Sequence, residues 1–223
     1  MRLSIIILAM SFSFSIYAST ELMVGLNSEV INDKSFDIFS ENDWVFGPQL
    51  KISQSIIAQM PLYLQIHMNY NSSSNKIFND IKTEFSEIIL STGISYEFNI
   101  LRDLLYLYCG ANFIYGTTDI KLKEDFISYS DSSSTYGGSL FSGTKITIPV
   151  SIFRGEQWQK QHWHQLVTMG IDIQLGYRFL TPLKYEKLHP SSNRPVNTEM
   201  FDISAGEVQI SGPYVLTSFA LLF

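Results

Sequence analysis

Two short spacings in this chain contain residue types that could do chemistry. His189 and Ser191 stand one residue apart, and a histidine close to a serine can act as the base that activates a hydroxyl nucleophile. They flank a proline in a long polar stretch, so we interpret them as part of a turn. His162 and His164 flank Trp163, and two imidazoles in that position can ligate one metal ion. No further ligand set accompanies them, so we interpret them as an interfacial anchor. The sequence predicts no catalytic residue, no cofactor and no metal site.

Eight titratable side chains share another property: each stands on the non-apolar face of a segment in which apolar residues recur at every second position. They are Glu21, Lys51, His67, Glu87, Glu97, Lys145, Asp172 and Arg178. If that face is enclosed, its charges must be paired or hydrogen-bonded, because a buried charge without a partner costs several kcal/mol. We therefore expect the opposite charges to neutralise one another in a polar network that includes Gln49, Gln65, Asn112 and Gln174. A narrow ion path along the same residues is the alternative.

The elements that place these side chains on one face are β-strands, whose successive side chains point to opposite faces. In the stretch LYLQIHMNY, for example, Leu62, Leu64 and Ile66 alternate with Tyr63 and Gln65. Segments of this kind, each long enough to cross a bilayer at a tilt, are expected at 20–28, 44–54, 61–71, 85–98, 104–118, 143–153, 163–180 and 208–223. The sequence therefore predicts an all-β fold, an eight-stranded antiparallel up-and-down transmembrane β-barrel whose narrow interior is filled by side chains.

The connections between these segments are expected to alternate in length. Long polar stretches follow the first, third, fifth and seventh segments and the other connections are short, as in barrels with short periplasmic turns and long external loops. We therefore expect both termini on the periplasmic side and four long surface loops that carry the surface-interaction role. The third loop, around Ser132 to Ser134 and Gly137-Gly138, also contains aromatic residues. These suit either protein recognition or strands that extend beyond the membrane.

Aromatic residues at outward positions give an independent indication of this arrangement. Those expected near the two edges of the barrel are Trp44, Tyr70, Tyr96, Phe98, Tyr115, Trp163 and Tyr177. Two girdles of aromatic rings at the interfaces of lipid and water are typical of spanning barrels. Strand propensity alone would explain the number of aromatic residues but not their clustering at strand ends, which argues against a soluble β-domain.

Bulk composition excludes other classes of protein. Only 16% of the 223 residues are charged, and the net charge of −6 without a clustered basic segment argues against nucleic acid as a partner. The single Cys109 excludes an intrachain disulfide. The first residues, MRLSIIILAMSFSFSIYAS, follow the charged, apolar and small-residue order of a signal peptide with cleavage after Ala18. We therefore expect a signal peptide at 1–18 and one barrel domain at 19–223.

The ending SGPYVLTSFALLF alternates as a closing strand would, and in a closed barrel it must pair with the first strand near ELMVGLN. With the signal peptide and the strand rhythm, this ending resembles the small outer-membrane β-barrel proteins of the OmpA-like and OmpX-like superfamily. The resemblance implies that alternate residues of the last strand form the signal read by the outer-membrane assembly machinery, namely Val215, Thr217, Phe219, Leu221 and Phe223.

The function implied by this resemblance is that of a non-enzymatic integral protein of the Gram-negative outer membrane, with an envelope-structural or surface-interaction role such as adhesion or host contact. The expected partners are outer-membrane lipids including lipopolysaccharide, the assembly machinery, and an extracellular protein or host surface. Two alternatives stay open. One is a narrow pore for small solutes or ions; the other is a lipid-modifying outer-membrane enzyme, because the spacing of His189 and Ser191 resembles that of lipid A deacylases.

Overall fold

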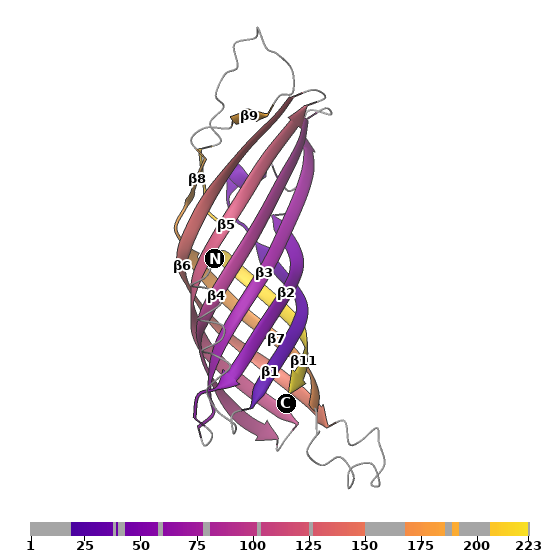
Figure 1. Ribbon diagram of the computed structural model, residues 1–223, viewed down its shortest axis with the longest axis vertical. Helices are drawn as coiled ribbons and strands as arrows, with labels where there is room; N and C mark the ends of the chain where they lie inside the picture. Colours follow the sequence, from indigo (N-terminus) through magenta and orange to yellow (C-terminus); the bar gives the residue numbers. More distant parts are fainter. Residues whose placement is uncertain are drawn as a thin grey trace, which may run out of the picture.

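The chain folds around one closed barrel of antiparallel strands, as the computed structural model shows for residues 19–37, 39, 43–57, 60–77, 81–101, 104–124, 127–149, 168–185, 189–191 and 206–222 (Figure 1). Within these residues the barrel strands are β1 (Thr20–Val30), β2 (Trp44–Ser55), β3 (Leu62–Ile77), β4 (Ile81–Leu101), β5 (Leu105–Glu124), β6 (Ile127–Pro149), β7 (Thr168–Leu180) and β11 (Gly212–Leu222). Each pairs with its neighbour in the chain, and β11 closes the barrel against β1. The predicted eight-stranded up-and-down barrel is confirmed.

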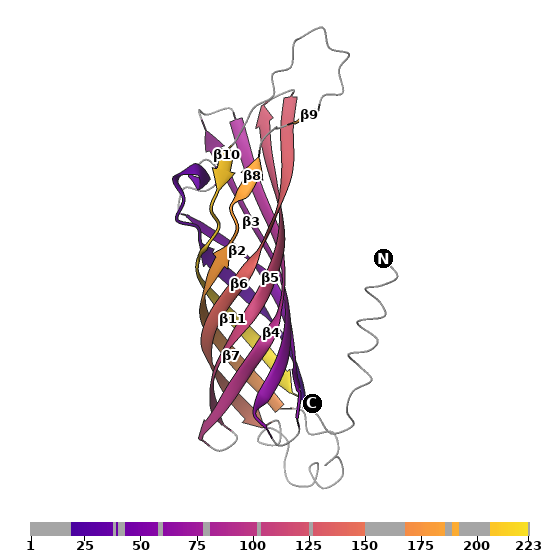
Figure 2. The same cartoon turned by 90° about the vertical axis from the view of Figure 1, so that its left-hand side faces the viewer.

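The two ends of the barrel differ. At one end, here called the terminal end, β1 begins and β11 finishes. At the other, here called the extended end, β3 to β6 rise beyond the remaining strands (Figures 1 and 2). The short elements lie toward this extended end: the 3₁₀ helix η1 (Lys34–Phe36), the paired β8 (Leu183–Tyr185) and β10 (Gly206–Val208), and β9 (His189–Ser191), which pairs with β6. In the described part of the chain, no helix is long and apolar enough to cross a membrane.

Glycines allow the strands to approach closely where the barrel closes. Gly25 of β1 stands opposite Ser218 of β11, and a Cβ at Gly25 would lie 1.9 Å from the carbonyl oxygen of Thr217. A Cβ at Gly47 of β2 would lie 1.5 Å from the carbonyl oxygen of Tyr70. Any other residue would force these backbones apart, so the inward glycines permit the tight curvature that a narrow barrel needs.

The outer surface of the barrel carries a broad belt of large apolar side chains. Among them are Val24, Leu26, Leu50, Leu64, Met68, Leu90, Ile94, Ile171, Ile173 and Leu175, each at least 40% exposed. The interior enclosed by this belt is mostly polar, with a smaller buried group of Tyr108, Phe141, Tyr214 and Leu216. A soluble protein buries large apolar side chains, whereas a spanning barrel turns them toward lipid. This belt is therefore the surface expected of a barrel within a bilayer.

Aromatic side chains lie at the edges of this apolar belt. Trp44, Tyr70, Tyr115 and Tyr177 are exposed toward the extended end, and the Trp44 ring stacks on Phe46 with centroids 5.9 Å apart. Tyr96 and Phe98, near the terminal end, are also exposed, with ring centroids 4.9 Å apart. Six of the seven predicted interfacial aromatics therefore stand on the outer surface. The seventh, Trp163, lies outside the described residues.

The prediction of four long loops is wrong for two of them. β3 continues to Ile77 and β4 begins at Ile81, so residues 78–80 alone connect them. Likewise β5 continues to Glu124 and β6 begins at Ile127. The sixth strand, expected at 143–153, therefore occupies 127–149, and its first half is the stretch expected as the third loop. The alternative of strands extended beyond the membrane describes this stretch. The expected alternation of connection lengths is wrong too, since residues 150–167 separate β6 from β7.

The extensions remain strands because their side chains still alternate, but in the opposite sense. Beyond Tyr70 and Ile88, the outward positions of β3 and β4 are polar, with serines, lysines and Glu84, while Phe85 points inward and is 1% exposed. The apolar belt thus ends along a line, here called the rim, above which polar residues face out and apolar residues face in. A search for strands with apolar residues outside does not recognise these segments, which explains the wrong boundaries.

Candidate functional site

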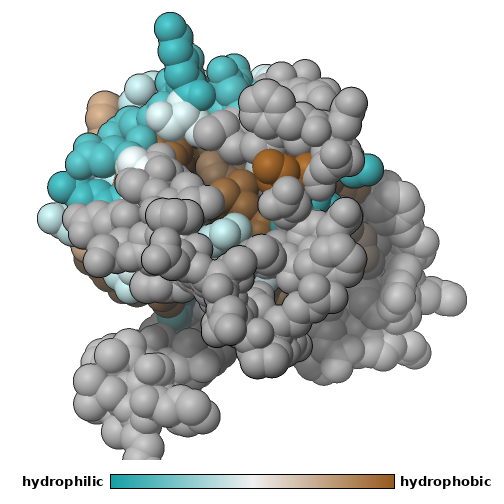
Figure 3. Space-filling view, turned by 90° about the horizontal axis from the view of Figure 1, so that it is seen from above, coloured by the Kyte–Doolittle hydropathy of each residue, from teal (hydrophilic) through white to brown (hydrophobic). Residues whose placement is uncertain are grey.

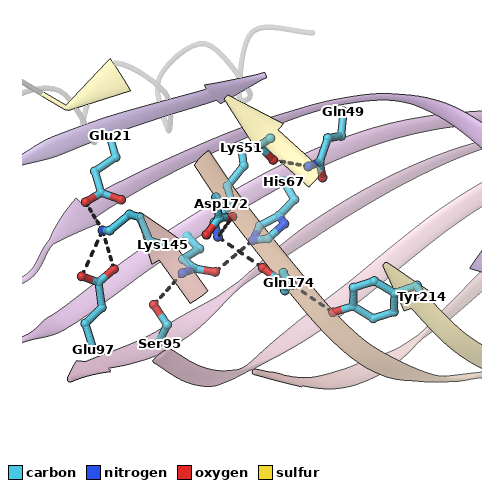
Figure 4. A network of polar contacts seen from close by, with 12 residues as sticks. Glu21, Gln49, Lys51, His67, Ser95, Glu97, Lys145, Asp172, Gln174 and Tyr214 are labelled. Carbon is cyan, nitrogen blue, oxygen red and sulfur yellow. Dashed lines mark hydrogen bonds and ion pairs between the residues drawn. The ribbon is translucent and has the colours of Figure 1, made fainter. Parts of the chain in front are cut away.

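The barrel interior holds a ladder of charges in three layers, the first of which lies nearest the terminal end. Lys145 of β6 stands between Glu21 of β1 and Glu97 of β4 (Figure 4). Its Nζ donates to the two Glu97 carboxylate oxygens at 2.9 and 3.0 Å and forms an ion pair with Glu21. The rings of Tyr63 and Tyr106 flank the same ammonium group, with centroids 5.5 and 5.1 Å away. Two buried carboxylates therefore share one buried cation.

The second layer joins Lys51 to the seventh strand of the chain. The Lys51 Nζ lies 3.4 Å from Asp172 Oδ2, donates to Gln174 Oε1 at 3.2 Å, and rests over the ring of Tyr108 at 4.7 Å (Figure 4). Lys51 and Asp172 are almost completely buried. Because every hydrogen-bonding group that Lys51 meets is fixed on another strand, this layer ties β2 across the interior to β7.

His67 belongs to the second layer but takes part in no ion pair among the described residues. Its Nε2 lies 3.0 Å from the Gln65 side-chain oxygen, and the Gln65 amide donates to Ser95 at 2.5 Å. The imidazole ring also packs near Phe141, with centroids 6.4 Å apart. This histidine is therefore held by an amide and an aromatic ring, not by a serine and a carboxylate as in a hydrolytic triad.

The third layer lies toward the extended end and centres on Arg178 of β7. Its guanidinium forms an ion pair with Glu29 of β1 and stacks 4.6 Å above the ring of Tyr214. The second acid of this layer is Glu87. Asn71 of β3 connects it to Glu29, because the Asn71 amide donates to Glu87 at 3.0 Å and to Glu29 at 3.5 Å. Two buried carboxylates again share one cation, with an amide between them.

All eight titratable residues predicted to face the interior are buried, and the structure distributes them over the three layers. Sequence reasoning missed Glu29, Asn71 and Tyr214. Glu29 lies one residue beyond the expected end of the first strand at 28, although the inward series of Glu21 and every second residue after it reaches Glu29 without a break. Of the four amides expected in the network, Gln49, Gln65 and Gln174 form side-chain hydrogen bonds within it. Asn112 is buried as well, and its side-chain oxygen has no hydrogen-bond partner among the described residues.

Of the two chemically interesting spacings of the sequence, one falls on β9 and the other lies outside the described residues. His189 and Ser191 lie on β9, opposite Ser130 and Ser128 of β6. They thus belong to a strand rather than to the expected turn, and the structure describes their backbone alone. His162 and His164 lie outside the described residues. Among the described residues, no group of three or more histidine, cysteine, aspartate or glutamate side chains could hold a metal ion.

An apolar cap fills the extended end inside the ring of strands. It combines inward residues of β2, β4, β5 and β7 with residues of the segments that connect β1 to β2 and β7 to β11. Its buried members are Ile31, Phe36, Phe39, Val45, Phe85, Ile89, Ile114, Ile120, Leu180, Leu183, Tyr185, Val208 and Ile210. From above, brown apolar side chains lie toward the middle of the molecule and teal hydrophilic ones toward its outer edge (Figure 3). The cap is a small core of the kind that soluble domains have.

Specific contacts fix the cap in place. The rings of Phe36 and Phe85 meet edge to face at 5.0 Å. The Tyr185 hydroxyl lies 2.6 Å from the Thr118 hydroxyl, and burial raises the pKa of Tyr185, so it stays protonated at physiological pH. Asp33 joins the two connecting segments, since one carboxylate oxygen accepts from the Ser35 backbone and the other from the Gln209 backbone. The extended end is therefore a folded unit.

The outer face of the extensions carries a group of lysines, here called the lysine face: Lys76 of β3, Lys82 of β4, and Lys121 and Lys123 of β5. Glu84 bridges two of them, since its carboxylate lies 2.8 Å from the Nζ of both Lys82 and Lys123. Hydrogen bonds from Lys123 and Lys82 lower the pKa of Glu84 to about 2, so this carboxylate is ionised under all physiological conditions.

Comparison with known proteins identifies the fold. No protein family and no curated protein matches the chain by sequence. Among solved structures, Ail, the attachment invasion locus protein of Yersinia pestis, is 10% identical with a TM-score of 0.50, over 93% of this chain and 100% of Ail. The outer membrane protein OprG of Pseudomonas aeruginosa is 11% identical with a TM-score of 0.53, over 92% and 96% of the two chains. A major outer membrane protein of Thermus thermophilus is 11% identical with a TM-score of 0.52, over 92% and 99%. This chain has the fold of small outer-membrane β-barrels.

Proposed function

We propose that this chain, which has the fold of small outer-membrane β-barrels, spans the outer membrane of a Gram-negative cell and holds its extended end outside as a rigid platform for contact with other surfaces. Both termini then lie in the periplasm, and the protein is not an enzyme. The observation that carries the proposal is the change of sidedness at the rim, where apolar residues pass from the outer to the inner face of the same strands.

That change of sidedness is favourable only if lipid surrounds the barrel below the rim and water surrounds it above the rim. Below the rim, apolar side chains such as Leu64 and Met68 face outward, which is favourable in lipid and unfavourable in water. Above the rim, an apolar cap inside and lysines outside are the arrangement of a domain in water. From Leu62 to Tyr70 strand β3, tilted by about 40°, rises about 21 Å, comparable to the apolar band of about 25 Å in known barrels.

The platform supports a surface-contact role better than mobile loops would. Its strands and cap fix the positions of exposed side chains, so a partner can bind without the entropy cost of ordering a loop. Ail, which has the same fold, is named for attachment and invasion, and one of its structures contains the heparin analogue sucrose octasulfate. We infer that an extracellular protein or host surface, together with lipopolysaccharide, meets this end of the molecule. The assembly machinery is a third partner, which reads the last strand up to Phe223.

The interior supports a sealed barrel rather than a pore. The three charge layers occupy its length, and the apolar cap covers its outer end. Purified protein in planar bilayers should therefore give no discrete conductance steps. Incubation with lipopolysaccharide, followed by mass analysis of lipid A, should show no change in the acyl chains.

Orientation can be tested by cysteine labelling of intact cells. In a Cys109→Ala background, Ser132→Cys places a thiol on the outer face of the extended end, and Ile57→Cys places one in the turn between β2 and β3 at the terminal end. A membrane-impermeant maleimide should label Ser132→Cys in intact cells and Ile57→Cys only after permeabilisation. If only Ile57→Cys is labelled in intact cells, the barrel has the opposite orientation. If neither variant is labelled before permeabilisation, the extended end lies in the periplasm or the cytoplasm.

A further inference from the structure

The lysine face contains like charges in direct opposition. Along one row across three strands, Lys76 pairs with Lys82 and Lys82 pairs with Lys123. Like charges directly opposite each other on one face of a sheet repel. Two residues nearer the rim, Glu84 stands between Ser74 and Lys121 in the next row. A negative charge next to this row of lysines is therefore favourable.

Glu84 compensates only part of this charge. It forms ion pairs with Lys82 and Lys123, whereas Lys76 and Lys121 have no ion-pair partner among the described residues. Asp119 is the other acid of this face whose side chain the structure describes, one row closer to the rim. Four lysines against two acids leave an excess of positive charge, although the chain as a whole has a net charge of −6.

The lysine face also has a concave surface and hydrogen-bond donors beside the charges. A groove of about 430 Å³ lies on this face, lined by Lys82 and Lys121, by hydroxyl side chains such as Ser72 and Ser74, and also by the carboxylates of Glu84 and Asp119. Ammonium groups and hydroxyls that converge on one groove are donors that a phosphate group accepts from, and charge-assisted bonds of this kind are stronger than neutral ones. The excess positive charge comes from the whole lysine face, which includes Lys76 and Lys123 beside the groove, and this face with its neighbouring hydroxyls fits phosphate esters.

The position of this surface indicates where the phosphate comes from. Glu84 and Lys82 lie four and six residues beyond Ile88, the last outward apolar residue of β4, which places them about 10 to 15 Å above the rim for strands tilted by about 40°. The lysine face points sideways from the barrel wall rather than up from its tip. The molecules beside a barrel wall at this height are the glycolipids of the outer leaflet, whose lipid A and core sugars carry phosphates.

We propose that the lysine face binds the phosphate groups of a lipopolysaccharide molecule packed against β3, β4 and β5. This inference rests on the proposed outer-membrane location and adds the site, the residues and the chemical group that they recognise. Lys76 and Lys121 supply the unpaired charge, the serines of the groove supply hydroxyl donors, and Glu84 holds Lys82 and Lys123 in place while opposing the anion.

Binding can be measured with the purified barrel in nanodiscs, using intact lipopolysaccharide and the same lipopolysaccharide after chemical dephosphorylation as probes. Lys76→Gln with Lys121→Gln should weaken binding of the intact probe about tenfold and leave binding of the dephosphorylated probe unchanged. The matched control is Lys34→Gln with Lys184→Gln, two exposed lysines of the extended end outside the lysine face, which should bind both probes as the wild type does. Heat-modifiable migration in gels verifies that each variant folds.

Glu84→Gln gives a result of the opposite sign, which a merely misfolded variant would not give. Replacing this carboxylate with a neutral amide raises the net charge of the lysine face by one, so binding of intact lipopolysaccharide should tighten severalfold. Equal binding by wild type, Lys76→Gln with Lys121→Gln, and Glu84→Gln would overturn the proposal. So would equal competition by a soluble heparin fragment, which would assign the face to a free polyanion. If these variants bind lipopolysaccharide as the wild type does while Ser132→Cys is labelled in intact cells, only the lysine-face inference is wrong. If Ser132→Cys lies in the periplasm, both proposals are wrong.

Discussion

Lys145 shows how strongly an inward charge depends on its neighbours in a narrow barrel. Its position inside follows from strand alternation, so the sequence predicts it, as it does for Glu97 and Arg178. The partner of each charge does not follow from alternation. Lys145 meets Glu21 and Glu97 from two other strands, and that pairing depends on the stagger of strands around the barrel, which no local pattern encodes. Glu29 escapes prediction for a simpler reason, since it lies just past an expected strand end.

Lys145→Met should lower the free energy of unfolding by about 3 to 5 kcal/mol, because it leaves Glu21 and Glu97 buried without their cation. Denaturant unfolding in lipid vesicles measures this. The control Lys34→Met, on an exposed residue of η1, should change stability by no more than about 0.5 kcal/mol. A loss smaller than about 1 kcal/mol for Lys145→Met would mean that the first layer is hydrated rather than dry.

Glu84 leads to a prediction about pH. Its folded pKa of about 2 lies below its ordinary value of 4.5, so its ion pairs stabilise the folded state above pH 4.5 and are lost only as pH falls through about 2. The lysine face should thus keep both bridges at pH 4. A carbon-13 titration of the Glu84 carboxyl by NMR should give a midpoint near 2; a midpoint near 4.5 would show that Lys82 and Lys123 do not hold it.

At the scale of elements, the most informative strands are β3 to β6, which continue above the apolar belt. The sequence predicts the lower halves of β3 to β6 because apolar and polar residues alternate there in the expected sense. It does not predict their upper halves, such as Ile127 to Thr135 of β6. There the outward positions are serines, and a criterion that requires apolar residues at outward positions assigns such a stretch to a loop. Two competing environments, lipid below and water above, act on the same strand, and one hydrophobic pattern cannot describe both.

Strand β3 allows both environments to be tested with one substitution type. Leu64→Arg places a charge on the outer face within the belt and should cost about 2 to 4 kcal/mol near the midplane of the bilayer. Ser74→Arg places the same charge on the same face above the rim, where it should cost less than about 0.5 kcal/mol. Unfolding in lipid vesicles measures both values, and equal costs would contradict a belt that ends at the rim.

At the scale of the whole molecule, closure is the feature best predicted from sequence. The ending SGPYVLTSFALLF predicts a strand that pairs with the first one, and β11 does pair with β1, with Phe219 opposite Val24. The apolar cap is not predicted, because its members come from the segment that connects β1 to β2, from four barrel strands, and from the β8 and β10 segments, which come together only when the barrel has closed. No local spacing relates residues so far apart in the chain.

Removal of Phe223 tests the assembly signal. If the terminal residue is read with Val215, Thr217, Phe219 and Leu221, the shortened chain should be exported and processed normally but accumulate in the periplasm in unfolded form. Heat-modifiable migration of membrane fractions measures the folded share. Phe219, within the same strand, offers a comparison through Phe219→Leu, which keeps an apolar outward side chain and should assemble. Normal folding of the shortened chain would remove Phe223 from the signal.

The change of sidedness at the rim is tested most directly by the surroundings of outward residues along β4. Cysteines placed one at a time at Leu90, Ile88, Ser86 and Lys82, in the Cys109→Ala background, can each carry a nitroxide label in the barrel reconstituted in lipid. Collision rates with oxygen, which concentrates in lipid, and with a water-soluble nickel chelate then report the local solvent. We expect oxygen to dominate at Leu90 and Ile88 and the nickel chelate to dominate at Ser86 and Lys82. Equal access of the nickel chelate to Leu90 and Lys82 would contradict the account.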